Sequence, residues 1–272
     1  MTTISVLMST YAGEKAANLA AALESICGQT RPPEQIVLVV DGPVGEEQET
    51  VIAHYATDRR VARMDVVRLP ESRGLALAMN AGLDRCIGDY IARMDSDDIS
   101  MPDRLELQLG YVTEDRSLDV VGSWSEEFFE DGTKPQLKIG PVRHHAIVDA
   151  LRWRNVLVHP ALLIRAEILR RVGGYKADFG KLEDYDLFVR LVQAGARFHN
   201  IPKVLVRVRS SLDQRARRGG LGYCINEIRF RRACLRRGFL NTRQFLVTTS
   251  AYVLFRLVSA TSRRHAYAMV RR

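Results

Sequence analysis

The sequence predicts an α/β fold built on a mixed, mostly parallel sheet, with a helical extension at the C-terminal end. Strand-like apolar runs alternate with helical patterns over the first hundred residues, the connections are short, and the pattern changes after residue 208. Alternating strands and helices form right-handed β-α-β units whose strands lie parallel. With 272 residues and 46% hydrophobic content, the chain is large enough for one domain with a substantial core.

The first half of the chain follows a Rossmann-like order of strands and helices. Residues 35–41 form a continuous apolar run that ends in Asp41, as expected of a strand buried on both faces. Apolar side chains from Leu19 to Ile26 recur at helical spacing, which predicts a helix over residues 16–28 with one side against the sheet. The other strands are expected at 3–9, 63–69 and 89–94, and the other helices at 46–57 and 74–86.

The second half is less regular, but it continues the same domain. We expect residues 1–208 to form one domain, divided into halves at 1–100 and 101–208. In the second half, helices are expected near 103–114, 143–153, 166–172 and 183–194, and strands near 119–125, 160–165 and 201–208.

Residues 209–272 form the predicted extension. A basic helix is expected over 222–238, followed by an apolar segment at 244–260. This segment has 17 residues and contains Arg256, whereas a membrane span needs about 20 mostly uncharged residues. We therefore expect a helix that lies in a membrane interface or packs on the domain, rather than one that crosses the membrane.

The formal net charge of +8 is distributed unevenly. The stretch from Lys203 to Arg272 contains 17 basic and 2 acidic residues, whereas the first 202 residues contain 23 basic and 30 acidic ones. A basic tail on an acidic body predicts an anionic partner, and we favour an anionic membrane surface. The arginines expected to meet it are Arg215, Arg217, Arg218, Arg231, Arg232, Arg236 and Arg237. A solvated face is one alternative. Nucleic acid is another, but no nucleic-acid-binding motif supports it.

The cysteines and the N-terminal sequence indicate the compartment. The four cysteines have no paired or metal-finger spacing, so they are predicted to be reduced core residues. The N-terminal sequence MTTISVLMS has no basic leader and begins a strand, which is not typical of a secretory signal. Together with the basic tail, this predicts a cytoplasmic protein at the inner face of the cell membrane. The cysteines are Cys27, Cys86, Cys224 and Cys234.

The strongest chemical signal is the acidic sequence Asp95-Ser96-Asp97-Asp98, which follows the strand expected at 89–94. In open parallel α/β sheets, ligands bind beyond the carboxyl ends of the strands. Carboxylates this close repel one another, so they need a cation or strong hydrogen bonds to stay ionised. Hard oxygen ligands suit Mg²⁺ or Mn²⁺ held together with substrate phosphates. The alternative is that Asp98 caps the helix expected after it.

Two further positions at strand ends are candidates for nucleotide contacts. Asp41 could accept hydrogen bonds from a base N–H or a ribose hydroxyl, unless it is an ordinary turn residue before Gly42. Arg73-Gly74 lies where a helix begins, so backbone N–H groups and a guanidinium could approach a phosphate there. A surface arginine beside a turn glycine is the alternative.

The sequence from Glu183 to Asp186 (EDYD) opens an amphipathic helix. Acidic residues at a helix N-terminus are favoured by the helix dipole whatever their function. The functional interpretation is a general base at the tip of the helix, facing the metal site. His159 precedes a strand, and it is either a satisfied structural histidine or an active-site residue.

The order of these motifs resembles that of the family 2 glycosyltransferases. Within that family the chain is similar to bacterial enzymes that build exopolysaccharide or O-antigen repeat units. The resemblance covers roughly residues 3–208 and rests on an ordered set of segments. These are Ser-Thr-Tyr (9–11), VVDG (39–42), RGLALAMNAGL (73–83), DYIARMDSDD (89–98), HPALLIR (159–165), GGY (173–175) and EDYDLFVRL (183–191).

The resemblance implies a glycosyltransferase-A fold, in which residues 1–100 are the nucleotide-binding half and residues 101–208 the acceptor-binding half. By similarity, Thr10, Tyr11 and Asp41 would hold the nucleobase. Arg73 would contact the base or a phosphate.

The resemblance also implies the residues of the chemical step. Asp95 would lie near the ribose, Asp97 would bind the metal, and Asp184 would be the catalytic base. Glu183 and His159 are further candidates for the active site or the acceptor site.

The implied activity is the metal-dependent, inverting transfer of a sugar from a nucleoside diphosphate sugar, with uridine diphosphate favoured. The acceptor would be a hydroxyl of a growing glycan on a lipid diphosphate. One alternative is a sugar-nucleotide nucleotidyltransferase, but a glycine-rich basic loop should then replace the residues from Thr10 to Glu14. The other is a non-catalytic glycan-binding scaffold, which should lack some of the acidic residues.

Overall fold

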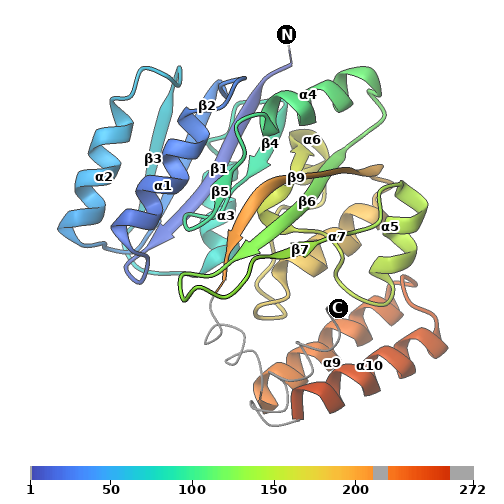
Figure 1. The fold of residues 1–272 in the computed structure, drawn as a ribbon. Coiled ribbons are helices and arrows are strands. Elements are labelled where there is room, and N and C mark those ends of the chain that lie inside the picture. The colour runs from blue at the N-terminus through green and yellow to red at the C-terminus, as the bar shows by residue number, and fades with distance from the viewer. Residues whose placement is uncertain (1, 211–219, 258–272) are drawn as a thin grey trace.

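A mixed sheet organises the computed structural model, which describes residues 2–210 and 220–257 (Figure 1). Within these ranges the strand order is β3-β2-β1-β4-β8-β6-β9-β5, and β7 pairs with β6. The strands from β3 to β4 are parallel, whereas β8 is antiparallel to both β4 and β6. The strands are β1 (Ile4–Tyr11), β2 (Gln35–Asp41), β3 (Met64–Leu69), β4 (Tyr90–Arg93), β5 (Ile99–Ser100), β6 (Val120–Phe128), β7 (Gln136–Lys138), β8 (Leu163–Arg165) and β9 (Phe198–Arg209).

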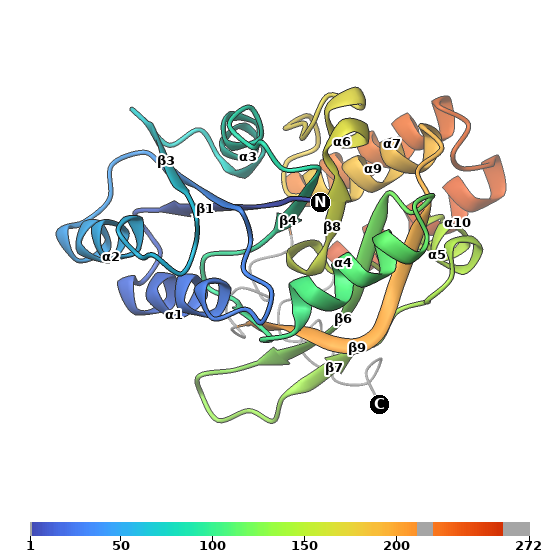
Figure 2. The same ribbon diagram turned by 90° about the horizontal axis from the view of Figure 1, so that it is seen from above.

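Helices cover both faces of the sheet (Figure 2). Successive side chains of the central strands alternate between two apolar clusters, so Leu7 and Val37 face one and Val6 and Leu38 face the other. One cluster packs against α1 (Ala16–Cys27), α2 (Glu46–Ala56) and α4 (Arg104–Glu114). The other packs against α3 (Leu75–Leu83), α5 (His144–Leu151), α6 (Ala166–Arg171) and α7 (Glu183–Gln193).

The α/β class and the elements of the first half agree with the sequence prediction. All seven residues of β2 are buried, as the continuous apolar run indicated. The strand expected at 160–165 is shorter, because His159–Ala161 form a 3₁₀ turn with Pro160 at its start. Strand β9 begins at Phe198 rather than near 201. The four cysteines are buried and form no disulfide, as predicted.

The C-terminal helices α9 (Leu221–Arg236) and α10 (Thr242–Leu257) pack beneath α7 (Figure 1). The Phe230 ring lies 4.8 Å from the Tyr185 ring and 5.6 Å from the Phe179 ring, between centroids. An ion pair of 2.8 Å joins Arg237 to Asp186 on α7. Helix α9 therefore shares the hydrophobic core of the α/β domain.

Two of the arginines that the sequence assigned to an anionic partner have partners inside the protein. Arg231 is only 1% exposed and pairs with Glu227 one turn earlier, so its assignment to a lipid surface was wrong. Arg237 pairs with Asp186. Arg232 and Arg236 are exposed. Arg215, Arg217 and Arg218 lie outside the described residues.

Helix α10 packs along α9 and leaves an apolar stripe on its outer side. Thr248 is buried, whereas Leu246, Val247 and Leu254 are at least half exposed. Among the described residues, no helix combines the length and the apolar character that crossing a bilayer requires. The segment expected at 244–260 is helical as far as Leu257, and this helix packs against α9 by one side.

The shared core predicts that Phe230→Ala lowers the free energy of unfolding by about 3–5 kcal/mol, because it leaves a cavity between α7 and α9. Chemical denaturation would measure this loss. Ile225→Ala on the same helix is the matched control, since Ile225 is 55% exposed and should change stability by less than about 1 kcal/mol. Equal small effects of both variants would contradict the docking of α9.

Candidate functional site

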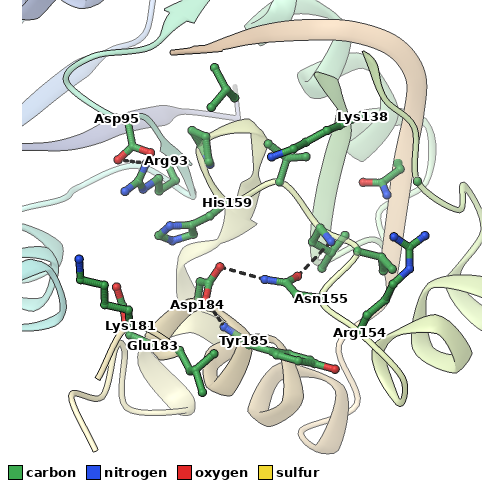
Figure 3. A pocket seen from close by; sticks show the side chains of 18 of the residues that line it. Arg93, Asp95, Lys138, Arg154, Asn155, His159, Lys181, Glu183, Asp184 and Tyr185 are labelled. Atoms are coloured by element: carbon green, nitrogen blue, oxygen red, sulfur yellow. Dashed lines mark hydrogen bonds and ion pairs between the residues drawn. The ribbon is translucent and has the colours of Figure 1, made fainter. Parts of the chain in front are cut away.

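The candidate site lies at the carboxyl ends of the parallel strands, beside a cavity of about 1010 Å³ (Figure 3). Strand β4 delivers Asp95 to this cavity, and the first turn of α7 delivers Glu183 and Asp184. The loop before β8 delivers His159. Three expected site elements, far apart in sequence, therefore border one space.

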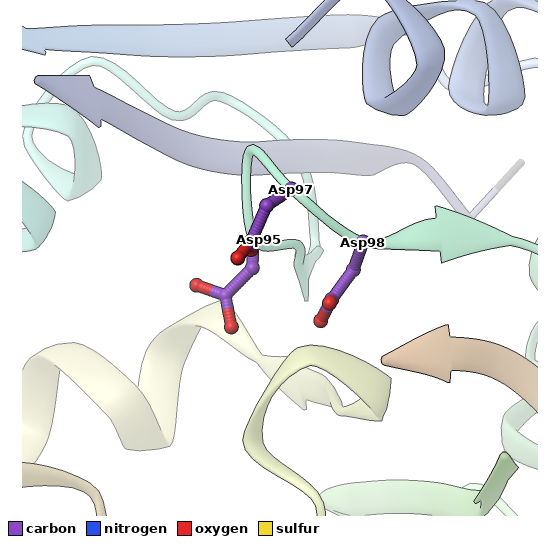
Figure 4. A group of neighbouring side chains, drawn as sticks. All are labelled: Asp95, Asp97 and Asp98. Carbon is purple, nitrogen blue, oxygen red and sulfur yellow. The ribbon is translucent and has the colours of Figure 1, made fainter. Parts of the chain in front are cut away.

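The acidic turn after β4 brings three carboxylates together (Figure 4). One oxygen from each of Asp95, Asp97 and Asp98 lies within 4.8 Å of the others. Asp95 forms an ion pair with Arg93, which is only 2% exposed. A buried guanidinium thus holds the first carboxylate of the turn in place.

The other two carboxylates of the turn have perturbed pKa values. Burial and the nearby charges of Asp95 and Glu14 raise the pKa of Asp97 to about 7. Burial, with Asp95 and Asp97, raises the pKa of Asp98 well above its usual range. A group of acids that resists ionisation without a counter-charge is suited to a cation that supplies one.

Asp98 does not cap the following helix, so that alternative is wrong. Its Oδ1 accepts a hydrogen bond of 2.8 Å from the backbone N–H of Arg209, and helix α4 begins only at Arg104. Its Oδ2 is buried and has no hydrogen-bond partner among the described residues. The donor set of hard oxygens and this unpaired oxygen fit a divalent cation such as Mg²⁺ or Mn²⁺.

Arg209, the last residue of β9, fixes the acidic turn through hydrogen bonds. Its Nε donates to the carbonyl of Asp97 at 2.9 Å, and its Nη1 contacts Glu130 at 2.6 Å. Sequence reasoning missed this residue, because Asp97 and Arg209 are 112 positions apart. No local pattern in the sequence pairs them.

Asp41 holds the loop that precedes α3. Its carboxylate accepts hydrogen bonds from the backbone N–H groups of Arg73 (2.7 Å) and Gly74 (2.9 Å) and from the Ser72 hydroxyl (3.0 Å). Gly74 adopts a φ of +83°, a conformation that favours glycine, and it precedes the first residue of the helix. Asp41 is therefore not only a turn residue before Gly42. Its carboxylate also fixes the backbone of the loop that carries the exposed Arg73.

Thr10 and Tyr11 end β1 beside Asp41, with which Tyr11 is in register. Thr10 is 1% exposed, and its hydroxyl accepts a hydrogen bond of 3.3 Å from Gln48. Tyr11 is 52% exposed, so its ring is accessible to a ligand. Of this pair, only Tyr11 presents a large side-chain surface to solvent.

Asp184 lies in the first turn of α7, oriented by two donors. Asn155 Nδ2 donates to one carboxylate oxygen at 2.9 Å, and the backbone N–H of Tyr185 donates to the other at 2.6 Å. Sequence reasoning missed Asn155, which carries no motif of its own. Burial, together with the charge of Asp184, raises the pKa of neighbouring Glu183, whose Oε2 is buried without a hydrogen-bond partner in the described parts of the chain.

His159 borders the cavity and is hydrogen-bonded within the core. Its Nε2 lies 3.0 Å from the Tyr175 hydroxyl, and its ring packs edge-on against Phe188. Burial, and secondarily the charge of Arg93, lowers the pKa of His159 well below its usual value. The ring is therefore neutral at physiological pH, and it borders the cavity as an uncharged group.

Comparison with known proteins gives concordant matches. A family model described as glycosyl transferase family 2 matches residues 5–173. The UDP-Gal:alpha-D-GlcNAc-diphosphoundecaprenol beta-1,3-galactosyltransferase of Escherichia coli is 33% identical over 267 residues, covering 98% of this chain and 95% of that protein. The amylovoran biosynthesis glycosyltransferase AmsE of Erwinia amylovora is 36% identical over 249 residues, covering 90% and 92%.

Solved structures show the same glycosyltransferase-A fold. S. aureus TarS superposes with a TM-score of 0.68 at 16% identity, covering 96% of this chain, which spans 45% of the TarS chain. The mannosyltransferase PcManGT of Pyrobaculum calidifontis, in complex with GDP-Man and Mn²⁺, superposes with a TM-score of 0.65 at 20% identity, covering 97% of this chain and 73% of that one. These likenesses concern the fold.

The lowered pKa of His159 predicts that acid destabilises the protein through this residue. The unfolded chain binds a proton on this imidazole below about pH 6.5, whereas the folded protein does not. Stability is therefore lost as the pH falls, and this group contributes up to about 2 kcal/mol of that loss between pH 7.5 and 5. The measurement is the free energy of unfolding at both pH values for wild type and His159→Phe.

The variant should lose less stability on acidification than wild type does, whatever its stability at pH 7.5. His145→Phe is the matched control, because His145 is exposed. An equal acid sensitivity of wild type and His159→Phe would show that His159 is charged in the folded protein.

Proposed function

Since the chain belongs to glycosyl transferase family 2, we propose that it transfers a sugar from a nucleoside diphosphate sugar to a hydroxyl of a growing glycan in polysaccharide biosynthesis. The observation that carries this proposal is that Asp95, the first residue of the acidic turn, and Asp184 border the same cavity. One provides a place for a diphosphate and its cation, and the other provides a base for an acceptor hydroxyl. A cavity that holds both reactants is what a single displacement requires.

The proposed donor site is the edge formed by β1, β2 and the loop before α3. The exposed ring of Tyr11 offers a surface for a base, beside Thr10. Each oxygen of Asp41 has two lone pairs, so the carboxylate that fixes the loop can also accept a hydrogen bond from a base N–H. Arg73 would contact the base or a phosphate.

We assign the nucleotide to uridine diphosphate on the strength of the relatives. The galactosyltransferase of Escherichia coli takes UDP-Gal by its name, and TarS residues 1–349 have been solved with UDP-GlcNAc. The archaeal mannosyltransferase was solved with GDP-Man. The base therefore varies among proteins of this fold, and binding measurements must test it.

The acidic turn would hold the cation, with Asp97 as its ligand and Asp95 toward the ribose. A bound Mn²⁺ or Mg²⁺ would offset the negative charge that develops on the departing nucleoside diphosphate. The protein contributes the geometry: Arg93 holds Asp95, and Arg209 holds the backbone of Asp97.

Asp184 would act as the general base, with inversion at the anomeric carbon. Its carboxylate takes the proton of the acceptor hydroxyl as that oxygen attacks. The hydrogen bonds from Asn155 and the backbone N–H of Tyr185 orient this carboxylate. Positioned general-base catalysis contributes about 10²- to 10⁴-fold to a rate.

We propose a lipid-linked acceptor and a location at the cytoplasmic face of the membrane. The galactosyltransferase relative acts, by its name, on GlcNAc-diphosphoundecaprenol. The apolar stripe on α10 would enter the membrane interface, and exposed arginines would meet anionic head groups. The stripe consists of Leu246, Val247 and Leu254, and the arginines are Arg232, Arg236 and Arg243.

Because Asp97 is proposed to bind the metal and Asp184 to act as the base, replacing each by its amide should affect a different step. Asp97→Asn should abolish the Mn²⁺-dependent part of uridine diphosphate binding, measured by calorimetry. Asp184→Asn should leave that binding unchanged and lower kcat by about 10²- to 10⁴-fold, measured on a panel of nucleotide sugars.

Each of these variants is the control for the other. Asp103→Asn, which removes a surface carboxylate paired with Lys203, should change neither quantity. Metal-independent binding of every nucleoside diphosphate, or full activity of Asp184→Asn, would reject the assignment. The anomeric configuration of the product, read by NMR, tests inversion.

The membrane proposal predicts that Leu246→Asp weakens binding to vesicles of phosphatidylglycerol and phosphatidylcholine by about tenfold, because a charge replaces an inserted apolar side chain. Cosedimentation measures the affinity. Ile87→Asp is the matched control, since Ile87 is 63% exposed but lies in the turn before β4. A point variant is used because deleting the C-terminal extension would also remove α9 and open the core. Equal binding by both variants would exclude α10 from the contact.

A further inference from the structure

We propose that α9 and α10 contribute a carbohydrate-binding subsite to the acceptor side of the cavity, formed by Tyr223, Glu227 and Tyr252. This inference rests on the proposed function and deepens it. In this account the C-terminal helices take part in acceptor recognition, in addition to any contact with a membrane. The three residues are called the extension wall below.

The extension wall and Asp184 border one continuous cavity. Ligand pockets commonly measure about 300–1,000 Å³, so a cavity of about 1010 Å³ has room for parts of two substrates. The Arg93–Asp95 pair marks its donor end. The extension wall comes from the other end of the chain, from helices packed beneath α7 (Figure 1). An acceptor whose hydroxyl reaches Asp184 would therefore extend toward this wall.

Tyr252 is held in place by a buried ion pair. The guanidinium of Arg231 lies over the Tyr252 ring, 4.3 Å from its centroid. Arg231 is 1% exposed and also donates to Glu227 Oε1 at 3.0 Å. A cation against an aromatic face and a carboxylate on the same cation form a rigid unit that joins the two helices. The ring therefore borders the cavity in a fixed orientation.

The buried pair of Arg231 and Glu227 is better explained by positioning than by stability. Burying two charges carries a desolvation cost that their attraction often does not exceed, so apolar residues at both positions would stabilise the helices as well. Here the pair sets the Tyr252 ring against the cavity, and Glu227, which is 2% exposed, borders it. Both features serve recognition of a ligand.

The chemistry of the wall fits a sugar ring. A pyranose presents C–H groups on its faces, which pack against aromatic rings, and hydroxyls at its edges, which donate to carboxylates. Two tyrosines and one glutamate offer both kinds of contact. Tyrosine is suited to partly solvated surfaces, because it combines an apolar ring with a polar hydroxyl. Hydrogen bonds to a charged acceptor are the stronger kind. A lipid tail has no hydrogen-bond donor for the carboxylate, so we assign this wall to a sugar of the acceptor.

The test is steady-state kinetics with UDP-galactose and UDP-N-acetylglucosamine as donors and a synthetic N-acetylglucosaminyl diphosphoryl alkyl lipid as acceptor probe. Tyr252→Ala should raise the KM for the acceptor about tenfold or more, the range of a few lost pocket contacts. Tyr223→Ala should act in the same direction. The affinity for uridine diphosphate and the rate of donor hydrolysis in water should stay unchanged, because those depend on the donor end.

Two controls separate recognition from folding. Tyr252→Phe keeps the ring and should retain a near-normal acceptor KM. Tyr111→Ala removes a half-buried tyrosine stacked on His199, away from the cavity, and should leave the acceptor KM unchanged.

The outcomes distinguish this inference from the proposed function. Transfer by wild type with an unchanged acceptor KM in Tyr252→Ala and Tyr223→Ala would overturn the subsite and leave the glycosyltransferase proposal intact. A loss of nucleotide affinity in parallel with the acceptor KM would also overturn it, since it would indicate a structural effect. Failure of wild type to use the probe with either donor, while still binding uridine diphosphate, would reject the lipid-linked acceptor and the subsite together.

Discussion

The mutual repulsion of three carboxylates within four residues is the constraint on which the rest of this site depends. Asp95, Asp97 and Asp98 share a turn that the sheet presents at its carboxyl edge. The protein keeps them together by supplying Arg93 to one and a backbone hydrogen bond to another. The remaining need for positive charge is what would give the turn an affinity for a cation. A site with fewer acids would fold more easily and bind metal less well.

The arrangement of the sheet follows from this turn. Strands β1, β2 and β3 run parallel to β4 and carry the loops of the donor edge to the same side. Strand β9 then crosses the second half of the sheet, pairs with β5 just after the turn, and brings Arg209 to Asp97. The two halves of the domain are therefore tied at the acidic turn itself. A change at the end of β9 would act directly on the acidic turn.

The parallel half of the fold could be predicted from the sequence because its strands and helices follow local, periodic patterns. The buried strand at 35–41 is an example. The sequence also singled out Asp95, Asp97 and Asp184 as candidates, and the structure places Asp95 and Asp184 at one cavity. The features that the sequence did not predict have one physical cause in common, because each depends on contacts between distant segments. Strands β5 and β7, of two and three residues, exist only through pairing. Asn155 and Arg209 matter through partners 29 and 112 positions away.

Charge composition gave its least accurate prediction at α9, where it assigned buried and paired arginines to an anionic surface. A count of arginines does not distinguish those on an exposed face from those that hold the helix to the domain, and Arg231 and Arg237 belong to the second kind. Asp186, on the same helix as Asp184, is fully buried between Arg190 and Arg237. The helix that carries the proposed base is thus pinned by the C-terminal helices. An extension that met only the membrane would have no need of that link, whereas one that shapes the acceptor site must be fixed to the base.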